Sequence, residues 1–64
     1  MKRNLLIKHL SEKNCVLYRE GSNHAMFRNP ENGKKTSVPR HQNIDEYLAF
    51  DICKQMGIPK PNIN

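Results

Sequence analysis

The spacing of hydrophobic positions along this 64-residue chain changes twice, which divides the sequence into helical and extended parts. Over residues 3–13, Leu6 and Leu10 stand four positions apart, which is the spacing of an amphipathic helix. Asn4 is the candidate N-cap, because a short polar side chain can accept hydrogen bonds from the free N–H groups of the first turn. Asn14 tolerates a left-handed backbone conformation and is expected to end this helix.

Three short segments in the middle of the chain have the composition of β-strands. Their β-branched, aromatic and other apolar residues predict strands over residues 15–20, 24–28 and 35–39. The first turn lies at Gly21-Ser22, where we expect the glycine to adopt a positive φ, and residues 29–33 form the second turn. Connections this short join antiparallel neighbours, so the three strands are expected to form a meander.

A second amphipathic helix is expected over residues 45–56. Leu48, Ile52 and Met56 repeat every four positions there, and we expect all three side chains to lie in the core. The sequence at the two ends of this segment also favours a helix of this length.

Asp45 is the candidate N-cap of the second helix, and Ile44 is expected to pack on Ala49 across its first turn. Gly57 is the expected C-terminal cap, because the prolines that follow it cannot continue the helix. Residues 59–64 are expected to form a frayed tail.

The resulting order of elements indicates an α+β fold in which two helices pack on one face of a three-stranded antiparallel sheet. Side chains alternate between the faces of a strand, so if Ala25 and Phe27 face the helices, their neighbours face solvent. A register shift of one residue would exchange the two faces. The side chains expected toward the helices also include Cys15, Leu17 and Val38. Those expected on the open face are Val16, Tyr18, His24, Met26, Arg28, Lys35 and Ser37.

Composition and charge limit what such a fold can do. With 36% hydrophobic residues the chain can build one thin core, so we expect a single domain whose active site lies on an open face. Residues 1–40 hold nine Lys/Arg against three acids (+6), and residues 41–64 hold two against three (−1), which together give the net charge of +5. This asymmetry favours a polyanionic or acidic partner, and plain solubility is the alternative interpretation.

The cysteines and histidines do not predict a disulfide framework or a metal site. Cys15 and Cys53 are too few for a framework and are expected to be free and buried. The three histidines and two cysteines lack the close paired spacing of zinc ligands, so no metal or other cofactor is expected. Only three consecutive apolar residues follow Met1-Lys2-Arg3, too few for a signal peptide or a membrane span, and we therefore expect a cytoplasmic protein.

His24 is the best candidate for acid–base chemistry, because histidine exchanges a proton near neutral pH and nucleic acid is the natural anionic substrate of a basic chain. RNA can be cleaved without metal if a base takes the 2′-hydroxyl proton and an acid protonates the leaving 5′-oxygen. Arg28 and Lys35 could hold the phosphate, and the backbone amides of Gly21-Ser22 could stabilise an oxyanion. The alternative for His24 is an ordinary solvated surface histidine.

The segment after the third strand holds a second candidate. His41 could be a second acid–base group, or it could cap the second helix or have no role. Arg40 beside it is expected to bind phosphate. Tyr18 could stack on a base or merely cover the sheet, and His9 is expected to be solvated on the polar side of the first helix.

Four motifs of this chain, taken together, resemble the HicA toxins of bacterial and archaeal toxin–antitoxin systems. The similarity extends over residues 1–58 in the family's order and spacing, and it implies one domain with a fold like that of the double-stranded RNA-binding domain. The motifs are Gly21-Ser22-Asn23-His24, Asn29-Pro30…Gly33, Val38-Pro39-Arg40-His41 and Ile52-Cys53-Lys54-Gln55-Met56-Gly57-Ile58.

The resemblance also implies a function. It implies an mRNA interferase that halts translation, with His24 as the catalytic histidine and Gly21 as the glycine of its motif. It implies a HicB antitoxin that covers the active site and that usually carries the DNA-binding segment, so that any contact with DNA is indirect. Two other interpretations stay open: a non-catalytic RNA-binding module that uses the same basic sheet, and an adaptor for an acidic protein.

Overall fold

The computed structural model describes residues 1–61 and confirms the expected α+β order of helix, three strands and helix. The sheet order is β1-β2-β3, and both pairs are antiparallel, as expected of a meander. The ranges expected for the second and third strands are confirmed, and the other elements begin or end within one residue of expectation. The elements are α1 (Arg3–Glu12), β1 (Val16–Glu20), β2 (His24–Arg28), β3 (Lys35–Pro39) and α2 (Glu46–Met56).

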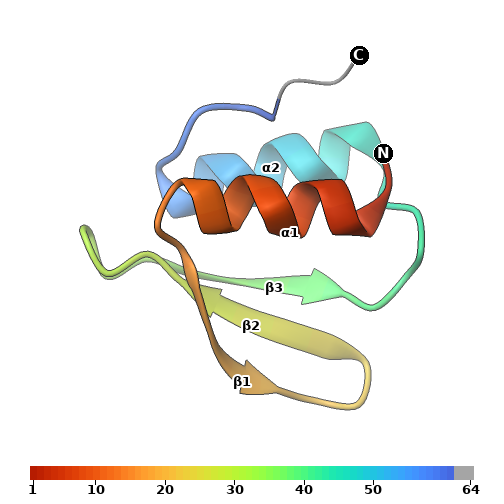
Figure 1. Ribbon diagram of the computed structural model, residues 1–64, viewed down its shortest axis with the longest axis horizontal. Coiled ribbons are helices and arrows are strands. Elements are labelled where there is room, and N and C mark those ends of the chain that lie inside the picture. The colour runs from red at the N-terminus through yellow and green to blue at the C-terminus, as the bar shows by residue number, and fades with distance from the viewer. Residues whose placement is uncertain (62–64) are drawn as a thin grey trace.

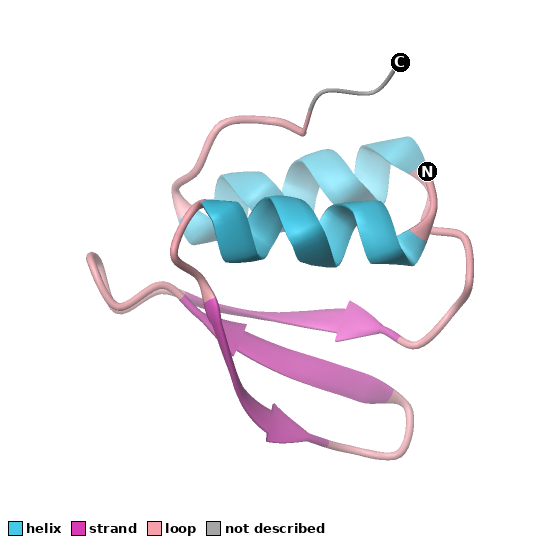
Figure 2. Ribbon diagram, in the orientation of Figure 1, coloured by secondary structure: helices cyan, strands magenta, loops and turns pink. Residues whose placement is uncertain are grey.

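The molecule has two layers. Figure 1 shows α1 in front of α2, with both helices on the same face of the sheet, and the opposite face carries neither helix. The colouring by secondary structure in Figure 2 shows the same separation of a helical layer from a strand layer. One face of the sheet is therefore buried and the other is open to solvent.

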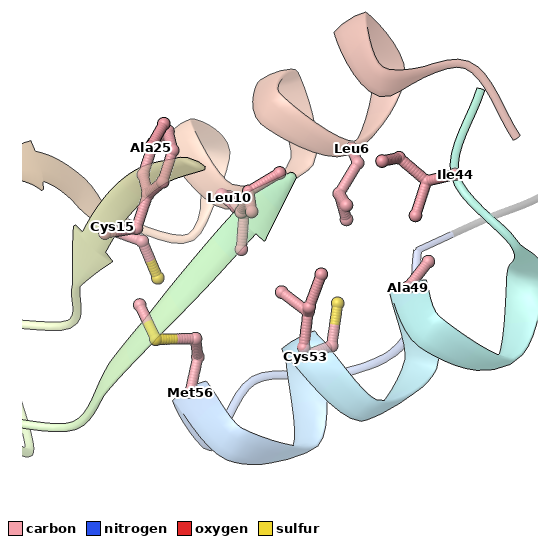
Figure 3. Close-up of a cluster of buried hydrophobic side chains, with 11 residues drawn as sticks. Leu6, Leu10, Cys15, Ala25, Ile44, Ala49, Cys53 and Met56 are labelled. Carbon is pink, nitrogen blue, oxygen red and sulfur yellow. The ribbon is translucent and has the colours of Figure 1, made fainter. Parts of the chain in front are cut away.

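The core lies between these layers and contains no disulfide, since both cysteines are buried as free thiols, as expected. Figure 3 shows side chains from both helices, from β2 and from the segments that flank the elements converging in this space. The buried hydrophobic residues are Leu6, Leu10, Cys15, Ala25, Phe27, Val38, Ile44, Ala49, Ile52, Cys53 and Met56.

One expected core residue of α2 lies outside the core. The side chain of Leu48 is 40% exposed, whereas Ala49, Ile52 and Cys53 are buried. The buried set follows the i, i+3, i+4 spacing that starts at Ala49, and Leu48 lies beyond the edge of that stripe. The prediction for Leu48 was therefore wrong, because a helix on a two-layer fold buries only one side.

Both helices end in the same hydrogen-bonded motif. After α1, Asn14 adopts φ 68°, and the N–H of Cys15 donates to the Leu10 carbonyl at 2.9 Å. After α2, Gly57 adopts φ 71°, and the N–H of Ile58 donates to the Cys53 carbonyl at 3.0 Å. In both cases the residue directly after the left-handed one donates its N–H to the carbonyl five residues earlier. This is the Schellman arrangement, which satisfies carbonyls that the helix leaves unpaired. These two helix ends are as expected.

Asn4 is not the N-cap of the first helix, contrary to the prediction. Helix α1 begins at Arg3, so Asn4 lies inside the first turn and Lys2 occupies the cap position without a side-chain bond. Backbone pairing takes the place of a side-chain cap, because the N–H of Arg3 donates to the Gln42 carbonyl at 2.9 Å. A β-bridge between Lys2 and Asn43 continues this pairing and ties the starts of the two helices together. Asp45 does precede α2 as expected, without a side-chain cap bond.

The β2–β3 loop is attached to the end of α2 by two asparagines. Asn29 is buried and donates from Nδ2 to the Met56 carbonyl at 2.9 Å, and Asn32 donates to the same oxygen at 3.0 Å. The Oδ1 atom of Asn29 accepts from the Glu31 N–H at 3.0 Å, which shapes the turn itself. These bonds fix the hairpin against the helical layer.

The chain after α2 turns back along the helices. The Pro59 carbonyl lies 2.8 Å from Nε2 of His9, the Lys60 ammonium lies 5.0 Å from the centroid of the Phe50 ring, and Pro61 is buried. His9 was expected to be solvated and is partly covered here. The expected frayed tail over residues 59–64 lies, for residues 62–64, outside the described part of the chain.

Replacing Gly57 by alanine is expected to destabilise the fold more than replacing Gly33. Both glycines have positive φ, but a Cβ at Gly57 would lie 2.7 Å from Asn32 Nδ2, whereas one at Gly33 meets nothing within 4 Å. The Asn32 side chain would have to move away and would lose its hydrogen bond to the Met56 carbonyl, which adds to the cost of the positive φ. We expect Gly33→Ala to cost about 1 kcal/mol and Gly57→Ala about 2–3 kcal/mol in the free energy of unfolding, measured with urea. Equal losses would contradict the close approach at Gly57.

The buried thiols predict a fall in stability at alkaline pH. Burial, and secondarily the nearby Cys15, raise the pKa of Cys53 to about 11 from its ordinary 9.0. The thiol of the unfolded chain therefore loses its proton at a lower pH than the thiol of the folded protein, and this deprotonation favours unfolding. The contribution of Cys53 to the free energy of unfolding is complete below about pH 9 and is lost as the pH rises to about 11. The free energies of unfolding of the wild type and of Cys53→Ala, measured between these pH values, check this. The variant should lose less stability than the wild type as the pH rises, and parallel curves of stability against pH would contradict the prediction.

Candidate functional site

His24 is the first residue of β2 and lies on the open face of the sheet. Ala25 and Phe27 are buried toward the helices, so alternation places His24, Met26 and Arg28 on the other side. His24 and Arg28 are exposed, and Met26 is half-buried. The expected assignment of the β2 faces is confirmed.

The third strand extends the same surface. Arg28 pairs with Lys35 across the β2–β3 ladder, so two cations lie side by side on the open face. The Lys35 ammonium is 5.6 Å from the centroid of the Tyr18 ring, a cation–π geometry. Tyr18 thus lies beside Lys35 in a surface that carries positive charge, and the residue is 44% exposed.

A β-bulge in β1 changes the expected faces of that strand. Leu17 pairs with Phe27, but the next pair is Arg19 with Met26, so Tyr18 is the extra residue. An unpaired residue reverses the alternation from that point, which brings Arg19 to the open face beside Met26. The sequence prediction missed Arg19, and no signal in the residue types around it indicates a bulge.

The first strand also fails to bury Leu17, which was expected in the core. Its side chain is 46% exposed, and every residue of β1 is exposed. Within residues 1–61, β1 is an edge strand that pairs with β2 alone, and the helical layer does not cover it. Cys15, directly before the strand, is buried as expected.

The turn between β1 and β2 is closed by the backbone of Gly21 and His24. The Gly21 N–H donates to the His24 carbonyl at 2.8 Å, so this amide is already bonded and does not point to an anion. The φ of Gly21 is not positive, contrary to expectation, and the glycine serves a close approach: a Cβ would lie 3.3 Å from the His24 carbonyl oxygen. Within residues 1–61 neither the N–H of Ser22 nor that of Asn23 donates to another backbone group.

Arg40 braces the same turn from the end of β3. Its Nε donates to the Gly21 carbonyl at 3.0 Å, its Nη2 lies 3.0 Å from Glu20 Oε1, and its backbone N–H donates to the Asn23 carbonyl at 3.2 Å. These three contacts join the loop before His24 to the segment after β3. Arg40 therefore lies at the predicted site, but part of its hydrogen-bonding capacity holds the turn.

His24 lines two neighbouring hollows. The first, of about 290 Å³, is lined by Arg19, Gly21, Ser22, Asn23, His24 and Met26. The second, of about 340 Å³, is lined by Ser22, Asn23, His24, Arg40 and His41. The structure thus brings together His24 and His41, which lie in different parts of the sequence, along one hollow. Arg28 and Lys35 lie at the opposite end of the β2–β3 ladder from His24.

Neither a cluster of metal ligands nor a membrane-spanning helix occurs in the part of the chain that the structure describes. No group of three histidine, cysteine or acidic side chains within residues 1–61 lies close enough to hold a metal ion. Within the same residues, no helix has the length and apolar composition needed to cross a membrane.

Comparisons with known proteins place the chain in a family. Neither the curated proteins nor the solved structures contain a match to this chain. The family model described as the HicA toxin of bacterial toxin–antitoxin systems matches residues 4–58, which covers the whole sheet, α2 and all of α1 except Arg3. The chain therefore belongs to the HicA toxin family.

Proposed function

We propose that this toxin is a metal-independent endoribonuclease that cleaves messenger RNA and so blocks translation. The observation that carries the proposal is the position of His24, an exposed proton carrier on the same open face as the cations Arg19, Arg28 and Lys35. Membership of a toxin family supports a harmful activity, and the net charge of +5 supports a polyanionic target.

The chemistry requires only proton transfer and stabilisation of charge. A base removes the 2′-hydroxyl proton, the 2′-oxygen attacks phosphorus, and the bond from phosphorus to the 5′-oxygen breaks as that oxygen takes up a proton. The products are a 2′,3′-cyclic phosphate and a 5′-hydroxyl. His24 is the proposed acid–base group, and His41 is the candidate for the second one, because both line the same hollow.

The binding residues divide into two groups by their surroundings. Arg28 and Lys35 are proposed to hold the RNA backbone along the sheet, since phosphate contacts position a nucleic acid without reading its sequence. The Ser22 amide is proposed to face the phosphate at the turn, where two N–H groups that donate to no backbone group within residues 1–61 can stabilise a developing negative charge. Gly21 and Arg40 contribute by shaping this turn, and Arg40 also adds positive charge beside it.

The proposed partner is a HicB antitoxin that covers the open face. An uncovered basic sheet suits such a partner, because burying it would remove the RNA site at the same time. In this proposal the toxin works in the cytoplasm, and any regulation through DNA passes through the antitoxin.

A non-catalytic RNA-binding module is the second candidate. The exposed ring of Tyr18 beside Lys35 favours it, because an aromatic side chain in a basic surface can stack on an unpaired base. The two functions differ in turnover, which incubation of purified protein with messenger RNA measures directly.

Replacing His24 by alanine is expected to lower the cleavage rate by about 100-fold or more, because the substitution removes a proton-transfer group. Growth arrest on expression should disappear, while the far-ultraviolet circular dichroism stays unchanged and the protein still binds its antitoxin. His9→Gln is the matched control, since it removes a histidine from α1 and leaves an amide that can donate to the Pro59 carbonyl. Near wild-type cleavage by a folded His24→Ala protein would remove His24 from the mechanism.

Cleavage is expected to continue in EDTA and to leave 5′-hydroxyl ends. The attacking oxygen belongs to the RNA, so the reaction needs no metal-bound water, and RNA with 2′-O-methyl groups should resist cleavage. The ends are checked by whether polynucleotide kinase labels the fragments without prior phosphatase treatment. Loss of activity in EDTA that a divalent ion restores, or fragments with 5′-phosphates, would contradict this mechanism.

A further inference from the structure

The two hollows at His24 share a common wall. Ser22, Asn23 and His24 line both of them, so the tip of the β1–β2 loop and the histidine form a ridge between the two. Arg19 and Met26 complete only the first hollow. Each volume lies near the lower end of the range of roughly 300–1,000 Å³ for ligand pockets, which suits one nucleoside better than a larger group.

The first hollow has the chemistry to hold an aromatic base. Met26 is half-buried and supplies an apolar, polarisable surface, and thioethers make favourable contacts with aromatic rings. Arg19 adds a planar guanidinium, which can stack on a base or bond a phosphate. Within residues 1–61 no acidic side chain lies in ion-pair contact with Arg19, whereas Arg40 on the other side is paired with Glu20. Arg19 therefore keeps its charge for a ligand.

We propose that the two hollows are subsites for the nucleosides on either side of the scissile phosphate, and that the substrate is consequently unpaired RNA. One base lies on Met26 beside Arg19, the phosphate lies on the ridge at His24, and the other nucleoside lies toward His41. This inference rests on the proposed endoribonuclease function and extends it to the conformation of the RNA.

The geometry of the reaction gives the physical reason. The 2′-oxygen must approach phosphorus opposite the leaving 5′-oxygen, and reactions of bound groups are fast only when the reacting atoms are aligned in this way. In a regular A-form duplex the two neighbouring bases stay stacked, which keeps these atoms out of line. Two hollows separated by a ridge turn the neighbouring nucleosides away from each other, and only unstacked, single-stranded RNA can adopt that shape.

Base unstacking can be measured separately from cleavage. The probe is a 20-nucleotide RNA that carries 2′-O-methyl groups throughout, so that it is not cleaved, with 2-aminopurine in place of one adenine at each of several positions. The fluorescence of 2-aminopurine rises when it unstacks. We expect the single strand to bind with a rise in fluorescence, and the same strand in a duplex to bind at least about tenfold more weakly and without the rise.

The variants test the individual walls of the first hollow. Arg19→Ala should weaken binding of the single strand about tenfold, whereas Lys54→Ala, which removes the same charge from α2, should change it less than twofold. Met26→Ala should weaken binding about three- to tenfold and reduce the fluorescence rise, and Met26→Leu, which keeps the volume and the apolar character, should restore most of both.

The outcomes separate this inference from the proposed function. Equal binding of single strand and duplex without unstacking, or equal effects of Arg19→Ala and Lys54→Ala, would overturn the subsites even if messenger RNA is cleaved. Binding with unstacking by a protein that cleaves no RNA would support the two hollows as binding sites for unpaired nucleosides and overturn the nuclease. Absence of any binding to the single strand would also overturn the subsites.

Discussion

The burial of Ala25 and Phe27 beneath the two helices is the constraint on which the rest of the structure depends. Their exposed fractions are 1% and 5%, so the middle strand is held with one defined face toward the core. Strand geometry then leaves His24, Met26 and Arg28 no position except the open face. The same hydrophobic contacts that stabilise this small fold therefore also place its candidate catalytic histidine.

An open sheet face limits the chemistry that the protein can perform. The surface does not enclose a ligand, so it cannot exclude water as a deep pocket does, and its contribution must come from positioning and from charge. The contacts of Arg40 with Glu20 and Gly21 contribute to positioning, because they hold the turn before His24. The cations on the sheet, which are Arg19, Arg28 and Lys35, supply the charge. An open face is also a surface that a partner protein can cover completely, which fits a toxin that is controlled by an antitoxin.

Local signals made most of the architecture predictable. Gly57 after α2 and the turn residues from Asn29 to Gly33 mark boundaries that depend on the conformation of a few neighbouring residues, and the predicted boundaries were correct there. Errors arose where the result depended on distant contacts. Leu48 was assigned to the core although only one side of α2 meets other residues, and Asn4 was assigned a capping role that backbone pairing with Gln42 performs instead.

The sequence by itself determined the order of elements and the division of the middle strand's side chains into two alternating sets, because alternation and helical periodicity are local properties of the chain. Which set faces the helices was an expectation that depended on the strand register, and the burial of Ala25 and Phe27 in the tertiary structure decided it. Only the tertiary structure decided the composition of the site around His24. The bulge at Tyr18 brings Arg19 to the open face, and the meander places His41 along the same hollow as His24. A bulge depends on pairing between strands, and the approach of two distant residues depends on the path of the whole chain, so neither can be inferred from residue types alone.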